Sequence, residues 1–424
     1  MQKSDPRYGA YVRVLEAHLK PAMGCTEPIA IAYAAAVAAR ALGQTPQSAR
    51  VWVSGNILKN AMAVTVPNTG GRKGIAAACA AGLAAGDPAL ELQVLSRVTA
   101  QHGPAIDALI PHIQVSLKPD ARLFDLLVEV EAQGQTASAR IADRHTNVVC
   151  VTQNGRILSQ TLLEGEETGQ NPDEALLSIE GVVDFADTCD LEDVRKPLQR
   201  QIDLNTAIAR EGLRGDWGAS VGRLLMDAAR DPAGRARAAA AAGSDARMSG
   251  CEMPVVINAG SGNQGITVSV PLIEYASALD LPHERLLRAL TVSNLIAIRL
   301  KALIGCLSAY CGAVSAGCAA GAGVCYLLGG DLYLVSHTLV NALAILSGTV
   351  CDGAKPSCAA KIACAVDAGF IGWGMAQRRK QFRDGEGIVK KGVENTILNN
   401  VARLGRDGMR ETDREILRIM SPGC

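Results

Sequence analysis

The choice between a membrane protein and a helical globular protein rests on residues 302–330, ALIGCLSAYCGAVSAGCAAGAGVCYLLGG, which carry no charged side chain. The stretch is long enough to cross a bilayer. It consists mostly of Ala, Gly, Ser and Cys, however, and the mean hydropathy of the whole chain is only +0.14. The following residues, 333–350, include His337, Asn341 and Ser347. We therefore predict the helical core of a globular protein, with an integral membrane transporter built on 302–350 as the alternative.

Helical patterns extend outward from this stretch to both ends of the chain. A helix is expected to open at Thr26, with Glu27 and Pro28 in its first turn, and to run to about Leu42. Residues 51–66 fit either a helix or a strand. Further helices are expected at 11–20, 75–85, 174–214 and over most of 272–420, and loops are expected at 163–174 and 229–247.

Residues 112–162 follow a different pattern, because Val and Ile alternate with polar residues there. Turn signals at Gly134-Gln135 and Asn154-Gly155 separate the runs, which predicts a small antiparallel sheet. We therefore predict an α+β fold, with a large, mainly α-helical domain and a smaller inserted antiparallel α/β segment. The helical catalytic domain is expected to comprise 1–100 and 190–424, and the small segment with the sheet 101–189.

Composition excludes several classes of function. The 424 residues contain 42 Lys+Arg and 42 Asp+Glu, so no electrostatic attraction to nucleic acid or an anionic membrane is expected. Aromatic residues make up only 3%, too few for platforms that stack single-stranded bases. The amino terminus carries charges where a signal peptide needs an apolar stretch. The 13 Cys are therefore read as free thiols or metal ligands in a reducing, cytoplasmic compartment.

Cysteine spacing suggests a metal site without fixing its ligands. Cys351 and Cys358 flank a Gly/Pro turn between two expected helices, so both thiols can point at one locus. Cys311, Cys318 and Cys325 recur every seven residues on one helix face, but they spread over roughly 21 Å. At most one of these three can therefore join the site. Incidental packing remains the alternative for the pair at 351 and 358.

Two more cysteines stand at chain positions with distinct chemistry. Cys25 directly precedes the helix expected at Thr26, and the positive end of a helix stabilises a thiolate. Glu27 opposes this effect if its carboxylate lies close, so a reactive thiol and an inert packing residue both fit. Cys424 ends the chain and is either a thiol with a long reach or a frayed tail.

Three polar stretches are candidates for binding a small anionic substrate. Residues 258–265 read NAGSGNQG, and backbone amides with Ser261, Gly262, Asn263 and Gln264 would make a cradle for a carboxylate. Asn56 and Lys59 lie in a second polar cluster, where the lysine would pair with a carboxylate or remain a solvated loop residue. His145 stands alone at a strand junction, where a structural role is as consistent with the sequence as a functional one.

Five motifs in order resemble the L-cysteine desulfidase family, which is related to the iron–sulfur L-serine dehydratases through their α-chain region. The likeness extends from Cys25 to about Leu404. The motifs are GCTEPIAIAYAAA around Cys25, SGNILKNAMAVTVPNTG at 54–70, HTNVV at 145–149, NAGSGNQG at 258–265 and CDGAKPSC at 351–358.

The resemblance implies a [4Fe-4S] enzyme that degrades L-cysteine to pyruvate, ammonia and sulfide without pyridoxal phosphate. The family's three cluster thiolates fall on Cys311, Cys351 and Cys358, and its proposed general base falls on Cys25. Three ligands leave one iron open as a Lewis acid. By this implication the 258–265 loop, with Lys59 as a further candidate, would hold the substrate carboxylate. A homo-oligomer is compatible with this interpretation.

Several alternatives remain open at the level of sequence. L-serine dehydration by the same type of cluster is the main one, because the serine enzymes carry a carboxy-terminal cysteine that can occupy the open iron, as Cys424 would here. A pyridoxal phosphate enzyme would need a Schiff-base lysine, and no lysine motif is found. A zinc-binding structural or regulatory protein is a further alternative.

Overall fold

Alternating apolar residues build a six-stranded sheet in the computed structural model, which describes residues 1–119, 121–163, 171–305 and 307–420. The strand order is β3-β2-β4-β5-β6-β7, and neighbouring strands are antiparallel except for the parallel pair β2 and β3. The strands are β2 (Ser48–Val53), β3 (Ile113–Leu117), β4 (Asp125–Ala132), β5 (Gln135–Ala142), β6 (Val148–Gln153) and β7 (Arg156–Gln160). The sheet expected within 112–162 is confirmed, and β2 joins it from earlier in the chain.

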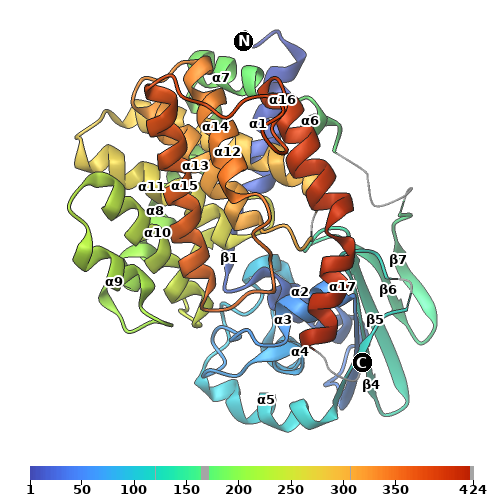
Figure 1. Cartoon of the computed structure of the whole chain (residues 1–424). Helices are drawn as coiled ribbons and strands as arrows, with labels where there is room; N and C mark the ends of the chain where they lie inside the picture. Colours follow the sequence, from blue (N-terminus) through green and yellow to red (C-terminus); the bar gives the residue numbers. More distant parts are fainter. Residues whose placement is uncertain (120, 164–170, 306, 421–424) are drawn as a thin grey trace.

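Helices α2 and α4 pack on one face of this sheet (Figure 1). Leu126, Val128 and Val130 of β4 point into the resulting core, as the period of two in a strand requires. Helix α2 has the predicted bounds, although its N-cap is Cys25 and not Thr26. The helices of this part are α2 (Thr26–Leu42), α3 (Gly55–Ala61), α4 (Gly74–Ala85) and α5 (Gly103–Leu109), with 3₁₀ turns η1 (Pro88–Gln93), η2 (Ala100–His102) and η3 (Ile110–His112).

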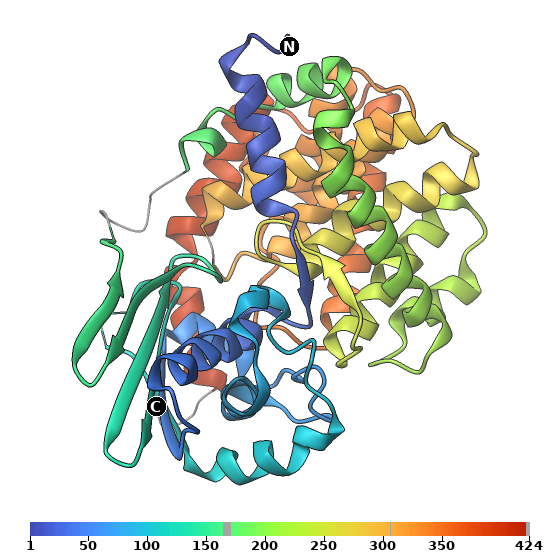
Figure 2. The same cartoon turned by 180° about the vertical axis from the view of Figure 1, so that it is seen from behind.

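The remaining chain forms a larger helical body above the sheet in Figure 1, so the predicted α+β fold dominated by helices is confirmed. A two-stranded antiparallel ribbon of β1 (Pro21–Met23) and β8 (Pro254–Val256) lies where the two parts meet (Figure 2). The helices are α1 (Pro6–His18), α6 (Pro172–Ala175), α7 (Ile179–Thr188), α8 (Glu192–Arg214), α9 (Val221–Ala228), α10 (Pro232–Met248), α11 (Gly262–Ala278), α12 (His283–Ile304), α13 (Gly312–Leu327), α14 (Leu332–Leu346), α15 (Cys358–Gln377), α16 (Val393–Thr396), the π-helical turn η4 (Ile397–Gly408) and α17 (Arg410–Met420).

The stretch 302–330 forms the end of α12 and a buried helix, α13. Its glycines permit close packing, since a Cβ atom at Gly321 would lie only 2.5 Å from the Cα of Gly369 in α15. Within the described ranges, α15 alone combines the length and apolar composition of a membrane span, and half of that span is buried inside the protein. A core helix of a globular protein has the same properties.

One prediction about secondary structure is wrong. Residues 229–247 were expected to form a loop, but 232–248 form α10, whose alanines are almost all buried. Asp231 caps this helix by accepting a bond from the backbone N–H of Gly234, and Pro232 takes its first position. Ala has the highest helix propensity and Arg is close behind it, so together they outweigh the Gly residues of this stretch.

The division into 1–100 with 190–424 and 101–189 stays a prediction, because no boundary between independent units is defined here. The structure adds that β2, α2 and α4 share one apolar core with the sheet. The carboxy-terminal segment then returns to this part, since α17 reaches α3 (Figure 1). A Cβ atom at Gly55 would lie 2.6 Å from Leu417 of α17. Elements from both ends of the chain are thus packed together beside the sheet.

Candidate active site

Three of the predicted site residues lie at the ends of helices in one region of the helical body. Cys311 is the N-cap of α13, Cys358 is the first residue of α15, and Cys351 follows α14. The backbone N–H of Cys311 donates to Thr349 O at 3.3 Å, and that of Cys351 donates to Ala309 O at 2.6 Å. A bridge between the two segments therefore holds Cys311 beside Cys351.

Cys351 packs against the small apolar cluster that contains Cys311, so the two thiols interact. This contact, reinforced by burial, raises the pKa of Cys311, and it lowers the pKa of Cys351 to about 6. Lys59 and Lys301 also favour the thiolate of Cys351. Burial raises the pKa of Cys358, while the charge of the Cys351 thiolate raises it further. The three sulfurs thus interact with one another electrostatically.

The chemistry of this donor set fits an iron–sulfur cluster. Thiolates are the ligands that such clusters use, and each thiolate of a cubane binds a different iron. Lys355 and Lys361 lie close enough to favour the thiolate of Cys358, although both also pair with Asp352. Among the residues described, no group of three His, Cys, Asp or Glu side chains is arranged to hold a single metal ion. A mononuclear zinc site at the three cysteines gains no support from this arrangement.

Three further cysteines lie on α13 and α15. Cys318 and Cys325 are fully buried in α13, and Cys364 is exposed on α15. That at most one member of the seven-residue series is a ligand stays a prediction. Cys424 lies outside the described residues.

Cys25 stands across from Cys358. It packs in a small apolar cluster with Val64 and Met248, and Cys358 packs against the same cluster. The thiol of Cys25 donates to Glu27 Oε2 at 3.1 Å. Burial raises the pKa of Cys25 well above the usual value for a thiol, and the negative charge of Glu27 adds to this effect. The expected stabilisation of a thiolate by the helix N-terminus is therefore outweighed, and the resting residue is a neutral thiol.

The 258–265 loop forms the N-terminus of α11. Ser261 is its N-cap and accepts a bond from the backbone N–H of Gln264. The side chain of Gln264 covers Gly312, since a Cβ atom at Gly312 would lie 2.8 Å from Gln264 Oε1. That oxygen is buried and has no hydrogen-bond partner among the described residues. Because Gly312 follows Cys311, the predicted substrate loop lies directly beside the predicted cluster ligand.

His145 lies against the same loop. A Cβ atom at Gly260 would lie 2.9 Å from His145 Cε1, and Gly260 has φ +83°, so glycine is required there twice over. Burial lowers the pKa of His145, while Glu27 acts in the opposite direction. Nε2 of this imidazole is buried and unpartnered in the described part of the chain. His145, Glu27 and Gly260 are therefore neighbours. The hydroxyl of Thr26, the residue before Glu27, donates to Gly260 O at 2.8 Å, which agrees with this arrangement.

Asn56 and Lys59 enter the region on α3. Lys59 contacts the turn after Cys351, since a Cβ atom at Gly353 would lie 2.5 Å from the carbonyl oxygen of Lys59. Its ammonium is fully buried and forms an ion pair with Asp413 of α17. Lys59 therefore has a partner within the chain, whereas the sequence suggested a substrate carboxylate. Asn56 is also buried, and its Oδ1 has no described partner.

Sequence reasoning missed Arg247 and Asp413. Arg247 fell in the stretch predicted as a loop, yet it ends α10 with only 3% exposure and donates to Gly24 O and Asn263 Oδ1. Asp413 lies 354 residues from Lys59. A helical interpretation of the alanine run would have placed Arg247 in a last turn, but no local pattern points to Asp413.

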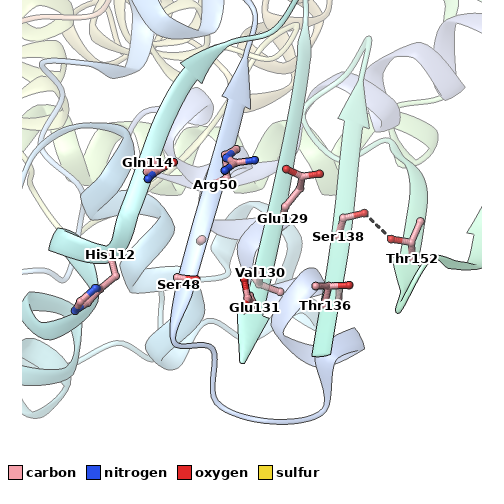
Figure 3. Close-up of a pocket in the computed structure, with 13 residues that line it drawn as sticks. Ser48, Arg50, His112, Gln114, Glu129, Val130, Glu131, Thr136, Ser138 and Thr152 are labelled. Atoms are coloured by element: carbon pink, nitrogen blue, oxygen red, sulfur yellow. Dashed lines mark hydrogen bonds between the residues drawn. The ribbon is translucent and has the colours of Figure 1, made fainter. Parts of the chain in front are cut away.

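A separate concavity lies on the open face of the sheet, opposite the face that α2 covers (Figure 3). Ser138 and Thr152 form a 2.7 Å hydrogen bond across β5 and β6 there. None of the predicted site residues lines it. The lining residues include Ser48, Arg50, His112, Gln114, Glu129, Thr136, Ser138 and Thr152.

Comparison with known proteins agrees with the resemblance found in the sequence. Residues 89–418 match the family described as the serine dehydratase alpha chain. A UPF0597 protein of Desulfitobacterium hafniense is 50% identical over 100% of this chain and 99% of its own length. UPF0597 proteins of Finegoldia magna and Lachnoclostridium phytofermentans are 46% and 45% identical, each over 97% of this chain and 99% of the relative. The matched family segment contains the three cysteines, but it begins after Cys25 and Lys59.

Proposed function

Because the chain belongs to the serine dehydratase alpha chain family, we propose that it is an iron–sulfur lyase that converts L-cysteine to pyruvate, ammonia and sulfide. The observation that carries this proposal is that Cys311 caps α13 and Cys358 begins α15, while backbone hydrogen bonds hold Cys351 beside Cys311. These residues would hold a [4Fe-4S] cluster. When bound through three thiolates, such a cluster supplies an open iron that acts as a Lewis acid on the leaving group.

Cys25 is proposed as the general base. Elimination needs a group that removes the α-proton of the substrate. The Cys25 thiol already donates to Glu27, so transfer of its proton to that carboxylate would produce a thiolate. The thiolate would then take the α-proton, and the proton on Glu27 would be available to the departing sulfide. Arg247 favours the thiolate form of Cys25, which supports this role.

The N-terminus of α11 is proposed to position the substrate. Ser261, Gly262, Asn263 and Gln264 would present backbone amides and polar side chains to the carboxylate. The unpartnered buried atoms of Gln264, His145 and Asn56 support a polar ligand, since buried polar atoms are normally hydrogen-bonded. Lys59 is proposed to favour the thiolate of Cys351 from its place beside the turn at Gly353.

Loss of the α-proton and of sulfide leaves aminoacrylate. This enamine tautomerises to the imine of pyruvate, and water then releases ammonia and pyruvate. One cysteine and one water therefore yield one pyruvate, one ammonia and one hydrogen sulfide. We propose that the reaction takes place in the cytoplasm, without pyridoxal phosphate, and that no nucleic acid or membrane takes part.

The test is anaerobic purification followed by iron and sulfide analysis and assay of sulfide and pyruvate release from L-cysteine. Broad absorption at about 400 nm is expected from thiolate-to-iron charge transfer. Cys351→Ala and Cys358→Ala are expected to lose iron and absorption together. Cys318→Ala is the matched control, because Cys318 belongs to the same seven-residue series as Cys311 but is buried in α13. Equal iron content in Cys351→Ala and Cys318→Ala would refute the ligand assignment.

L-serine is the second candidate substrate, and the name of the matched family favours it. The same residues would then remove water in place of hydrogen sulfide. Pyruvate release from L-serine and L-cysteine at equal concentrations separates the two proposals, and a kcat/KM higher for serine would reassign the substrate.

A further inference from the structure

The guanidinium of Arg247 is a buried cation without a counterion in the described part of the chain. Arg247 is 3% exposed, and no carboxylate among the described residues forms an ion pair with it. Burying a charge is costly unless it is paired and hydrogen-bonded. A positive charge retained inside the protein beside the candidate site is therefore expected to meet a negative group there.

The contacts of Arg247 use only part of its hydrogen-bonding capacity. A guanidinium has five N–H donors. Nη2 donates to Gly24 O at 2.8 Å and Nη1 donates to Asn263 Oδ1 at 3.1 Å, whereas Nε has no partner among the described residues. A Cβ atom at Gly262 would lie 2.2 Å from Nε, so glycine at 262 is what admits the guanidinium to this position.

The position of Arg247 connects the two sides of the candidate site. Gly24 directly precedes Cys25, and Asn263 lies in the first turn of α11. Arg247 is close enough to favour the thiolate of Cys25 and to oppose protonation of His145. Ala259, Gly260, Ser261 and Glu27, which border this group, are partly exposed, so solvent reaches its edge.

Arg247 and the first turn of α11, which it contacts at Asn263, carry unpartnered atoms of different kinds. Nε of Arg247 is a donor without an acceptor, and Oε1 of Gln264 is an acceptor without a donor. An α-amino acid carries a carboxylate and an ammonium group on one carbon, and so supplies both missing partners. A simple anion would satisfy only the arginine.

We infer that Arg247 binds the α-carboxylate of the substrate, with the acceptor oxygen of Gln264 facing the α-ammonium. This inference rests on the proposed function for the identity of the substrate. The two contacts themselves would recognise any α-amino acid. The arginine, and not Lys59, is then the charged partner of the carboxylate, since the ammonium of Lys59 already pairs with Asp413.

The test uses L-alanine and L-alaninamide as probes on the anaerobically purified full-length holoenzyme. L-alanine has no β leaving group and is not consumed, while L-alaninamide lacks the carboxylate charge. Calorimetry is expected to show tighter binding of L-alanine by the wild-type protein. Arg247→Gln is expected to weaken L-alanine binding by about 10- to 100-fold, the range for hydrogen bonds to a charged group, and to leave L-alaninamide binding unchanged.

Arg237→Gln is the matched control. Arg237 lies on the same helix, about 15 Å earlier along its axis, and pairs with Asp367. This variant should bind both probes as the wild type does. If Arg247→Gln loses its fold or its iron, Gly262→Ala provides a second test, because the added methyl group forces the guanidinium aside. It should reduce the preference for L-alanine by at least about 10-fold.

Two outcomes would overturn the inference: a wild-type protein with no preference for L-alanine over L-alaninamide, or a preference that persists in both variants. Sulfide and pyruvate release from L-cysteine is measured on the same samples. Absence of turnover together with an Arg247-dependent preference would refute the proposed function and leave the carboxylate site intact. Turnover together with a preference independent of Arg247 would refute the carboxylate site and leave the proposed function intact.

Discussion

Replacing Asp413 with asparagine is expected to destabilise the protein and loosen the cysteine site. One carboxylate oxygen pairs with the fully buried ammonium of Lys59, and the other accepts a 3.0 Å hydrogen bond from the backbone N–H of Ala309. Ala309 O in turn accepts the N–H of Cys351. Asp413 therefore connects α3 and α17 to the segment that holds the predicted ligands.

The size of the effect follows from the burial of Lys59. Removing one partner of a buried ion pair leaves an uncompensated charge and costs about 3–5 kcal/mol. At the usual unfolding entropy per residue, the free energy of unfolding of a 424-residue chain changes by about 0.9 kcal/mol for each degree near Tm. Asp413→Asn should therefore lower Tm by about 3–6 °C. Because Asn Oδ1 can still accept the N–H of Ala309, most of this loss is assigned to the ion pair.

The assay is thermal unfolding of the anaerobic protein followed by circular dichroism, with iron content measured on the same sample. Asp407→Asn serves as the control, because Asp407 pairs with Arg406 at an exposed position of the same segment. The double variant Lys59→Met/Asp413→Asn should recover most of the lost stability, since no buried charge remains. A loss in Asp413→Asn no larger than in Asp407→Asn would refute this reasoning.

Three further predictions concern separate parts of the chain. Glu27→Gln should lower the pKa of the Cys25 thiol by removing a neighbouring negative charge. Iodoacetamide should then alkylate Cys25 faster at pH 8, as measured by mass spectrometry. An unchanged rate of alkylation would contradict the contact between Cys25 and Glu27. Burial raises the pKa of Asp245 to about 6, so the folded state binds its proton more tightly than the unfolded state does, and the free energy of unfolding in urea should fall from about pH 4 to about pH 6. Asp245→Asn should flatten this dependence, and a slope unaffected by the substitution would speak against it. Gly321→Ala should cost about 1–3 kcal/mol in the same urea titration, because its methyl group would overlap Gly369; a stability equal to that of the wild type would contradict the close approach of α13 and α15.

Periodic sequence patterns were sufficient to predict the strands and helices whose ends are marked by nearby residues. The strands between 113 and 160 and helix α2 could be predicted because each turn or helix start is marked by residues within the same few positions. Helix geometry also limited the predicted metal site to at most one of Cys311, Cys318 and Cys325, without saying which. The alanine run of α10 was misread as a loop because Arg and Gly residues interrupt it, although Arg247 at its end lies inside the protein.

The rest of the candidate site depends on contacts that no local pattern encodes. Lys59 and Asp413 meet across 354 residues, and Thr26 donates to Gly260 across 234. The sequence therefore suggested a carboxylate partner for Lys59 without containing the information that α17 supplies one. The acidic neighbour of Cys25 was visible in sequence, but only the structure gives its distance of 3.1 Å.

The same geometry explains how a chain of zero net charge can favour anions at one place. Cys25, Ser261 and Cys311 cap the N-termini of α2, α11 and α13, and Cys358 begins α15. Each helix N-terminus contributes unpaired N–H groups and a partial positive charge. These dipoles are fixed by packing inside the protein, where salt screens them less than it screens surface charges. An interior built in this way places partial positive charge beside the candidate site without a basic surface, so the neutral composition of the chain is compatible with a site for a carboxylate.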